Sequence, residues 1–250
     1  MTRWTGWVRS ALWLGFFAVI LGAWWLMYSM ARMSGVDLLG RPVSMNMMPM
    51  DGFGALFVMW AAMMAAMMLP TMVPTLRAYD DLTRSAGATR AGWLGVLAGF
   101  FAVWVVFAAG IAAVQVALLR AGVIDDLGIA TSGLISGGLL IAVGLFQFTR
   151  AKEVCHGVCH APTTYFLGHW RPGGHGGLRM GVSLGAFCVG CCWGFMALGF
   201  VGGVMSLLWM GAATLFMVLE KLPQIGHRLL RPAGAALCLA GGGLIAASIL

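Results

Sequence analysis

The sequence GVSLGAFCVGCCWGFMALGFVGGVMSLLWMGAATLFMVL, from Gly181 to Leu219, decides the fold because its 39 residues include no charged side chain. A single helix of this length would be about 58 Å long, nearly twice the thickness of a bilayer core of about 30 Å. The stretch must therefore fold back on itself. Gly202-Gly203 is the natural hinge, since glycine tolerates the backbone angles of a tight turn. We expect two membrane-crossing helices joined at this hinge.

The rest of the chain has the same apolar character. Of its 250 residues, 61% are hydrophobic and 9% are charged, and the mean hydropathy is +0.92, whereas about 25% of the residues in a soluble domain are charged. The net charge of +7 does not indicate nucleic-acid binding, because most basic residues lie in loops beside apolar segments, where they set topology and contact lipid head groups. The composition predicts an all-α, polytopic transmembrane helix bundle in contact with the lipid bilayer.

Seven apolar segments are long enough to cross a bilayer as helices, and they form one integral membrane domain, residues 1–250. The predicted helices lie near residues 11–31, 52–72, 92–119, 131–149, 180–202, 204–221 and 232–250. Pro232 is expected in the first turn of the last helix, where proline is well tolerated. A polar loop that contains cysteines and histidines is expected at residues 150–179. The first segment is long and has no cleavage site after it, so we expect it to be retained as a helix.

The distribution of lysine and arginine predicts the orientation. If the seven helices alternate in direction, 12 basic residues fall on one side and 3 on the other, and the richer side is cytoplasmic. This places the N-terminus inside and the C-terminus outside the cytoplasm of a bacterial inner (cytoplasmic) membrane. The 12 residues are Arg3, Arg9, Arg77, Arg84, Arg90, Arg150, Lys152, Arg171, Arg179, Lys221, Arg228 and Arg231, and the other 3 are Arg32, Arg41 and Arg120.

Small residues recur at four-residue spacing in the predicted helix at 180–202. Such spacing lets neighbouring helices approach closely in a membrane. We therefore expect this helix to be the packing centre of the bundle. The pairs are Gly181 with Gly185, Gly190 with Gly194, and Gly199 with Gly203.

The same helix carries three cysteines, Cys188, Cys191 and Cys192. Spacings of three and four residues place their sulfurs on one helix face, which Met196 continues. Thiolates are good ligands for Cu(I). The alternative is that each cysteine packs as a small hydrophobic residue. The sequence favours a sulfur site on this face.

Methionines form a second sulfur-rich feature. Met59, Met63 and Met67 recur every four residues, so they share one face of the predicted helix at 52–72, and Met64 and Met68 lie beside them. We call these five residues the methionine column. Thioethers are soft, uncharged ligands that suit Cu(I), so the column could pass such an ion by ligand exchange. Packing in the core or against lipid is the alternative.

The segment Met45-Asn46-Met47-Met48-Pro49-Met50 precedes the methionine column, on the side predicted to face away from the cytoplasm. A loop gains little from packing four methionines, so we interpret the segment as a collector of soft metal ions. The alternative is an apolar loop that rests at the membrane interface.

The predicted polar loop contains further metal-ligand residue types. Cys155 and Cys159, like His156 and His160, are four residues apart, so each pair would share a face if the segment were helical. Cysteine and histidine bind copper or zinc. Solvated histidines in an ordinary loop are the alternative. The adjacent charges Glu220 and Lys221 end an apolar helix. They could anchor the helix at the interface or face the cavity of the bundle, and we favour anchoring.

Taken together, these residues resemble the DUF2182 family, predicted metal-binding integral membrane proteins of bacteria. The resemblance extends over about residues 53–222 and is most specific at the cysteines. It implies metal binding but neither a substrate nor a direction of transport. The similar segments are Trp60 to Pro70, Phe146 to Thr149 with Cys155 and Cys159, His169 to Arg171, Leu178 to Gly181, Phe187 to Met196, Gly203 to Met205, and Leu219 to Lys221.

The sequence therefore predicts a membrane protein that binds a soft metal ion and moves or stages it, with Cu(I) favoured and zinc as the alternative. We expect a transport or binding protein rather than an enzyme, and no nucleotide or nucleic acid as a ligand. A metallochaperone or other membrane subunits are the expected partners. Two other functions stay open. Quinone-dependent thiol oxidation would indicate a membrane thiol oxidoreductase, and activity that survives replacement of all six cysteines would indicate a structural or assembly subunit.

The orientation is testable with a reporter enzyme that is active only outside the cytoplasm. The reporter should be active when it is fused after Leu250 and inactive when it is inserted within residues 150–179. The reverse pattern would invert the assignment of sides.

Overall fold

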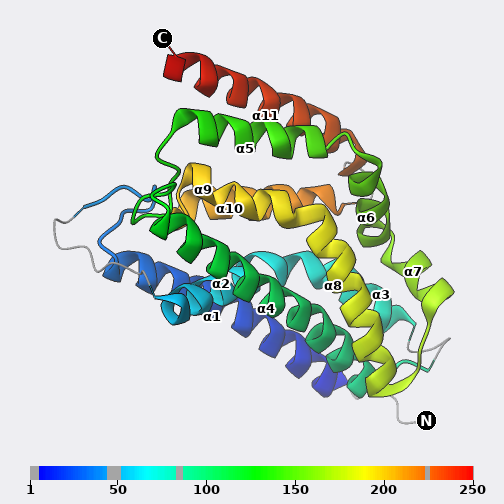
Figure 1. Ribbon diagram of the computed structural model, residues 1–250. Helices are drawn as coiled ribbons and strands as arrows, with labels where there is room; N and C mark the ends of the chain where they lie inside the picture. Colours follow the sequence, from blue (N-terminus) through cyan, green and yellow to red (C-terminus); the bar gives the residue numbers. More distant parts are fainter. Residues whose placement is uncertain (1–5, 44–51, 83–86, 223–225, 250) are drawn as a thin grey trace.

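The computed structural model describes residues 6–43, 52–82, 87–222 and 226–249, and these residues fold as a bundle of helices (Figure 1). The described residues contain no strand beyond isolated bridges. The elements are α1 (Gly6–Met33), α2 (Phe53–Met68), the 3₁₀ turn η1 (Pro70–Met72), α3 (Val73–Asp81), α4 (Arg90–Arg120), α5 (Gly133–Phe146), α6 (Arg150–His160), α7 (Pro162–His169), α8 (Gly173–Ala197), α9 (Gly199–Gly202), α10 (Leu207–Glu220) and α11 (Gly226–Ile249).

Five of the described helical stretches are long and apolar enough to cross a membrane. Two of the seven predicted segments are shorter: α5 and α10 have 14 residues each. Helix α5 is followed by α6 at a bend of 65°, and the two together have the length and apolarity of a broken span. The five long stretches are Trp7–Met33, Phe53–Asp81, Arg90–Arg120, Gly173–Gly202 and Arg228–Ile249.

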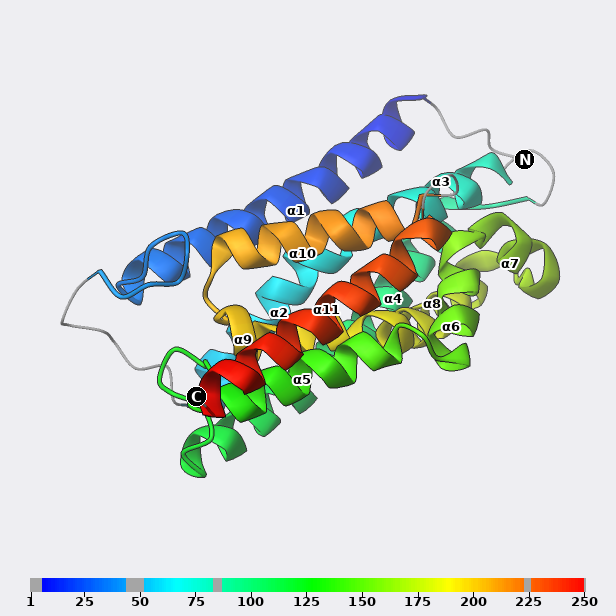
Figure 2. The same cartoon turned by 90° about the horizontal axis from the view of Figure 1, so that it is seen from above.

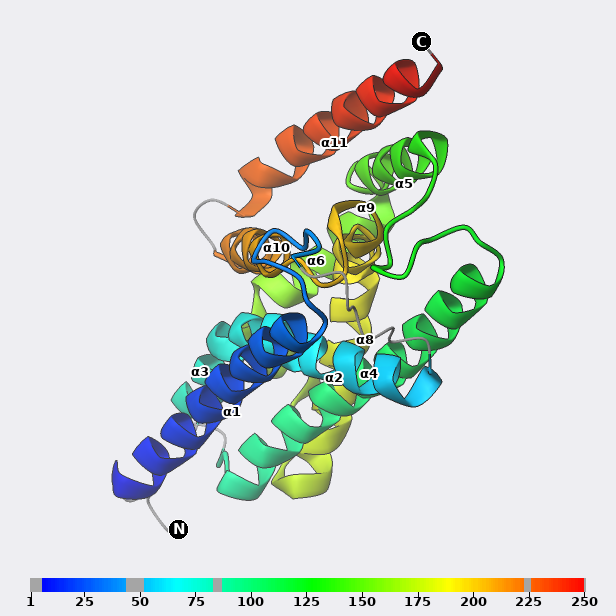
Figure 3. The same ribbon diagram turned by 90° about the vertical axis from the view of Figure 1, so that its left-hand side faces the viewer.

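The helices form two groups on either side of α10. Helices α5 and α11 pack together on one side, and α1, α2 and α4 lie on the other, with α8 crossing the bundle (Figures 1 and 3). Viewed from above, α10 lies between α11 and α1 (Figure 2). Leu208 N donates to Leu38 O at 3.0 Å, and Ala130 N donates to Phe200 O at 2.8 Å. The segments that follow α1, α4 and α9 therefore meet at one end of the bundle, as alternating helix directions require.

The hinge at Gly202-Gly203 is confirmed. Helix α9 ends at Gly202, and Gly203 has φ of +91°, a backbone conformation that side chains other than glycine rarely adopt. Ser206 then caps α10 by accepting a hydrogen bond from Trp209 N. The turn reverses the chain, so that Phe195 of α8 packs against Phe216 of α10 with ring centroids 4.9 Å apart.

The prediction of a polar loop at residues 150–179 is wrong, because α6, α7 and the start of α8 occupy most of this segment. Thr149 caps α6 by accepting a hydrogen bond from Lys152 N. The buried residues of α6 are Lys152, His156 and Cys159, whose spacing defines one helix face. Proline in the first turn then starts α7. A face that packs on the bundle therefore stabilises a helix whose composition is polar.

The expected start of the last helix is also wrong. Helix α11 begins at Gly226, so Pro232 lies inside it rather than in its first turn. Proline removes one backbone hydrogen bond inside a helix. The carbonyl that loses its partner is that of Arg228, an exposed residue, so solvent or a head group can bind it instead.

Helix α8 is the packing centre, as the glycine spacing predicts. It contacts α4, α6, α5 and α9. Glycines let α8 and α4 touch backbone to backbone: a Cβ atom on Gly177 would meet the backbone of Gly92, and one on Gly181 would meet the backbone of Val96. Residue numbers rise together along this contact, so α4 and α8 run parallel. Helices α5 and α11 run antiparallel, with Gly133 against Ser248 and Gly144 against Gly234.

The glycine contact predicts a position-dependent effect of alanine. Gly181→Ala should destabilise the protein by about 1–3 kcal/mol, because the new methyl group meets immovable backbone. Gly110→Ala in α4 is the matched control, since nothing lies within 4 Å of its Cβ position. Thermal unfolding in detergent measures both variants. Equal stability of the two variants would contradict the close contact between α4 and α8.

Candidate metal centre

The three cysteines of α8 are buried on one side of the helix, as their spacing predicts. Cys188, Cys191 and Cys192 are 0%, 3% and 1% exposed, so none faces solvent or lipid. The Cys191 thiol donates a hydrogen bond to the Cys188 carbonyl at 3.2 Å, and its sulfur lies 3.3 Å from that of Cys192. All cysteines of the chain are free thiols. The face therefore concentrates unoxidised sulfur inside the bundle.

A third sulfur reaches Cys188 and Cys191 from α6. The sulfurs of Cys159, Cys188 and Cys191 all lie within 4.8 Å of one another, and we call them the three-sulfur centre. Helix α6 comes this close because residue 190 is glycine: a Cβ there would lie 2.9 Å from the sulfur of Cys155. Cys159 follows one helix turn after Cys155 on the same face.

The spacing of the three sulfurs fits one metal ion. For metal–sulfur bonds of about 2.3 Å, the length of zinc–thiolate bonds, three sulfurs around an ion in one plane lie about 4 Å apart and two opposed sulfurs about 4.6 Å apart. The observed upper limit of 4.8 Å requires only small movements to reach either arrangement. Cys192 is not part of the mutually close group, although it touches Cys191. The donor set is therefore three soft thiols, with a fourth beside them.

A buried ammonium group lies next to the three-sulfur centre. Lys221 is 5% exposed, and its Nζ lies 3.4 Å from the sulfur of Cys188 and 3.0 Å from Oγ1 of Thr71. The ring of Phe100 lies beneath this ammonium, 5.9 Å away. A positive charge at this distance compensates the negative charge of a thiolate. Lys221 therefore favours the form of Cys188 that binds metal.

A buried ion pair also lies beside the cysteines. Lys152 of α6 and Glu220 of α10 are 0% and 2% exposed, and Lys152 Nζ lies 3.2 Å from Glu220 Oε2. The same ammonium donates to the carbonyl of Cys191 at 2.9 Å. The expectation that Glu220 and Lys221 anchor a helix at the interface is therefore wrong. Both side chains point into the bundle, where Glu220 meets Lys152 and Lys221 meets Thr71 and Cys188.

The predicted histidine ligands face elsewhere. His156 Nε2 lies 2.8 Å from the backbone oxygen of Glu220, and the ring of His160 stacks on that of His156 at 5.3 Å. His169 stacks on Tyr165 at 4.8 Å. Among the described residues, the mutually close group of ligand atoms contains cysteines alone. His156 therefore joins α6 to the end of α10.

The methionine column is buried inside the bundle, which excludes contact with lipid. Met59, Met63, Met64, Met67 and Met68 are at most 3% exposed, and Met196 of α8 is 2% exposed. Hydrogen bonds connect the end of the column to the cysteines: the Thr71 hydroxyl donates to the Met68 carbonyl at 2.8 Å, and Thr71 Oγ1 accepts from Lys221. The column therefore ends beside the helices that carry the three-sulfur centre. The methionines at 45, 47, 48 and 50 lie outside the described residues.

Two lysines that are predicted to act as topology signals belong to the centre. Lys152 and Lys221 were counted with the cytoplasmic charges, yet both are buried and bonded to α8 cysteines. Thr71 was not identified at all. The sequence contains a signal for these residues, because charged side chains are rare in it. In a chain with so few charges, a lysine or glutamate beside the end of an apolar helix requires a buried partner.

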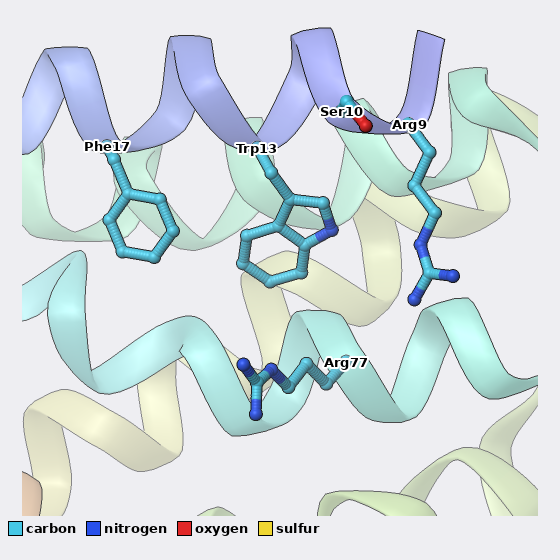
Figure 4. A pocket seen from close by; sticks show the side chains of 5 residues that line it. All are labelled: Arg9, Ser10, Trp13, Phe17 and Arg77. Carbon is cyan, nitrogen blue, oxygen red and sulfur yellow. The ribbon is translucent and has the colours of Figure 1, made fainter. Parts of the chain in front are cut away.

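A separate pocket of about 480 Å³ lies between α1 and α3. Figure 4 shows its lining, Arg9, Ser10, Trp13, Phe17 and Arg77. Asp80 borders this region by accepting hydrogen bonds from Arg9 and Trp13. None of the predicted metal ligands lines the pocket, so the sulfur chemistry belongs to the helix interior and not to this cavity.

The comparison with known families gives one match. The sequence model of a family described as PpoB2: Copper chaperone matches residues 57–244, about three quarters of the chain. The matched region contains all six cysteines and the methionine column but begins after Met50. It agrees with the metal-binding character that the DUF2182 resemblance implied, under a different family description. No curated protein and no solved structure matches the chain.

The three-sulfur centre predicts a ranking among cysteine variants. Serine at any one of the three positions should lower Cu(I) affinity, because a hydroxyl is a hard, poor ligand. The loss should be at least about 10–100-fold, which is what removal of a group that only hydrogen-bonds to a metal ligand costs. The three variants are Cys159→Ser, Cys188→Ser and Cys191→Ser. Cys238→Ser is the control, since that thiol lies on α11 and donates to the carbonyl of Ile141. Competition with a Cu(I) chelator under reducing conditions measures affinity. An unchanged affinity in a folded Cys188→Ser/Cys191→Ser variant would remove this centre from consideration.

Proposed function

Because the chain belongs to the PpoB2 copper chaperone family, we propose that it is a membrane protein that binds Cu(I) at Cys159, Cys188 and Cys191 and passes the ion between the two sides of the membrane. The observation that carries the proposal is the three-sulfur centre itself, in which thiols from two helices converge in the buried interior. Buried, convergent thiols suit a soft metal better than any hard cation.

The number of convergent sulfurs favours Cu(I) over zinc. The Lys152–Glu220 pair is neutral, so Lys221 supplies one net positive charge at the cysteines. Two thiolates, one thiol, Cu(I) and Lys221 together have no net charge, and neither do three thiolates, Zn²⁺ and Lys221, so charge balance allows either ion in an apolar interior. Structural zinc sites use four ligands in a tetrahedron, whereas three sulfurs converge here and Cys192 lies outside the mutually close group.

The helices support a location in a bacterial inner membrane. Five stretches have the length and apolarity of membrane spans, and side chains such as Leu14, Leu21 and Trp25 of α1 are about 70% exposed, as contact with lipid tails would allow. Short apolar α10 and the bent pair α5–α6 would complete seven crossings. The lysine and arginine distribution then gives a cytoplasmic N-terminus and an external C-terminus.

The route of copper follows the sulfurs. Residues 45–50 would collect Cu(I) outside, the methionine column would carry it by ligand exchange, and the three-sulfur centre would hold it near the cytoplasmic end. Methionine binds Cu(I) without a proton change, whereas cysteine thiolates bind it more firmly, so the order favours inward movement. Cys155, His156 and His160 of α6, with Cys192 and Met196 of α8, would assist transfer to a cytoplasmic metallochaperone. Handling of the ion requires no covalent chemistry, so we propose a non-enzymatic role.

Substitutions in the methionine column distinguish a role in transport from a role in packing. Met63→Leu with Met67→Leu conserves volume and hydrophobicity, and such core changes usually cost less than about 1.5 kcal/mol. The double variant should therefore fold, yet it should lose copper movement because leucine has no lone pair. Copper accumulation in cells or proteoliposomes, corrected for protein amount, measures the effect.

Two further variants act as controls for this experiment. Met63→Cys with Met67→Cys keeps the sulfur and should retain more flux than the leucine variant. Met27→Leu changes an equally buried methionine of α1 that is outside the column and should leave flux unchanged. Normal flux through Met63→Leu/Met67→Leu would show that the column only packs, and the function would then rest on the cysteines.

A further inference from the structure

Only one of the three sulfurs comes from α6, so the geometry of the centre depends on how α6 is held. Both ends of α6 are breaks in the chain direction. A bend of 65° separates it from α5, and Ala161, with ψ of 63°, interrupts the helix before α7. Helix α6 is therefore a separate 11-residue unit whose position against α8 must be fixed by its own contacts.

Lys152 provides the strongest of these contacts. Its ammonium is fully buried, donates to Cys191 O at 2.9 Å and to Glu220 Oε2 at 3.2 Å, and lies over the ring of Phe195 at 5.3 Å. One side chain of α6 thus binds both α8, at a cysteine of the centre, and α10. Cys159 follows two helix turns later on the same buried face.

Electrostatics makes this contact decisive for the position of α6. A buried charge without its partner is strongly unfavourable, so the buried Glu220 carboxylate favours the position of α6 in which Lys152 faces it. Oε1 of Glu220 has no hydrogen-bond partner among the described residues, which leaves Oε2 and its bond to Lys152 to hold the carboxylate. When α6 moves away, both charges must find water, and Cys159 leaves the other two sulfurs.

We infer that Lys152 is a positioning residue for the three-sulfur centre: its ion pair with Glu220 holds α6 against α8 and thereby decides whether copper is bound by three cysteines or by Cys188 and Cys191 alone. The inference rests on the proposed copper function and adds how the ion is released. Three sulfurs retain Cu(I), whereas two leave an open position that an incoming thiol from an acceptor protein can occupy.

The first measurement uses metal-free protein in detergent, so it does not depend on copper binding. The labelling is done in a Cys155→Ser/Cys238→Ser background, because those two thiols are only half-buried and would otherwise react. Cys159 is 5% exposed and should react slowly with a maleimide. Lys152→Met should raise its labelling rate by at least about tenfold, because an unpaired Glu220 disfavours the seated position of α6. Peptide mass mapping should show that Cys188, Cys191 and Cys192 stay protected.

A second substitution distinguishes the ion pair from general loss of packing. Lys152→Met with Glu220→Met removes the unpaired charge, and apolar replacement of a buried pair is often neutral or stabilising. Protection of Cys159 should therefore largely return. If Lys152→Met does not fold, Glu220→Gln keeps the side-chain volume and an acceptor oxygen and should still accelerate labelling. Arg9→Gln removes the exposed partner of a different ion pair, with Asp80, and should have no effect.

The second measurement is the copper K-edge X-ray absorption spectrum of the loaded protein. The unmodified chain should show three sulfur neighbours, Lys152→Met should show two, and the double methionine variant should return to three. Three sulfurs and a protected Cys159 in Lys152→Met would overturn the positioning role, as would a double variant no better than the single one. Absence of sulfur-bound copper in the unmodified chain would instead contradict the proposed function, while the labelling experiment would still test the role of Lys152.

Discussion

The charged side chains beside the cysteines are buried in a chain in which only 9% of residues are charged, and their need for partners fixes how the helix ends meet. These side chains are Lys152, Glu220 and Lys221. An isolated charge in an apolar interior is costly, so each must be placed against an opposite charge or several acceptors. Lys152 joins α6 to α8 and α10, and Lys221 joins the end of α10 to η1 and α8. Removing either charge would leave another group without its partner.

Helix α8 serves packing and chemistry on different parts of its surface. Its first half carries glycines that bring it into backbone contact with α4, which requires side chains no larger than hydrogen at Gly177 and Gly181. Its second half carries the cysteines, and the glycines there, Gly190 and Gly194, admit Cys155 of α6 and Val143 of α5. Close packing on one side thus holds the helix rigidly while α6 approaches it on the other.

The arrangement joins soft ligands to a low-dielectric interior. Sulfur is the least costly metal ligand to bury, because a thiol or thioether loses little hydration compared with a carboxylate or an imidazole. A protein that must hold Cu(I) away from water and oxidants gains from this combination. The buried lysine beside Cys188 then offsets the charge that a thiolate introduces, so the metal-binding form is compatible with burial.

The sequence by itself determined every feature that depends on local spacing. The all-helical character, the reversal at Gly203 and the shared face of Cys188, Cys191 and Cys192 follow from apolar length, glycine chemistry and the period of the helix. Helical periodicity also allowed Cys155 and Cys159 to share a face, but it gave no reason to choose a helix over a loop for that segment, because the stabilising face meets residues far away in the chain.

Only the tertiary structure decided which faces meet. Cys159 joins Cys188 and Cys191, whereas His156 turns to the carbonyl of Glu220, although both residues lie on the buried face of α6. The ion pair between Lys152 and Glu220, at the same face of α6, links residues 68 positions apart. Local spacing sets the direction of a side chain from its own helix, but its partner depends on the packing of all the helices and on where buried charges are neutralised.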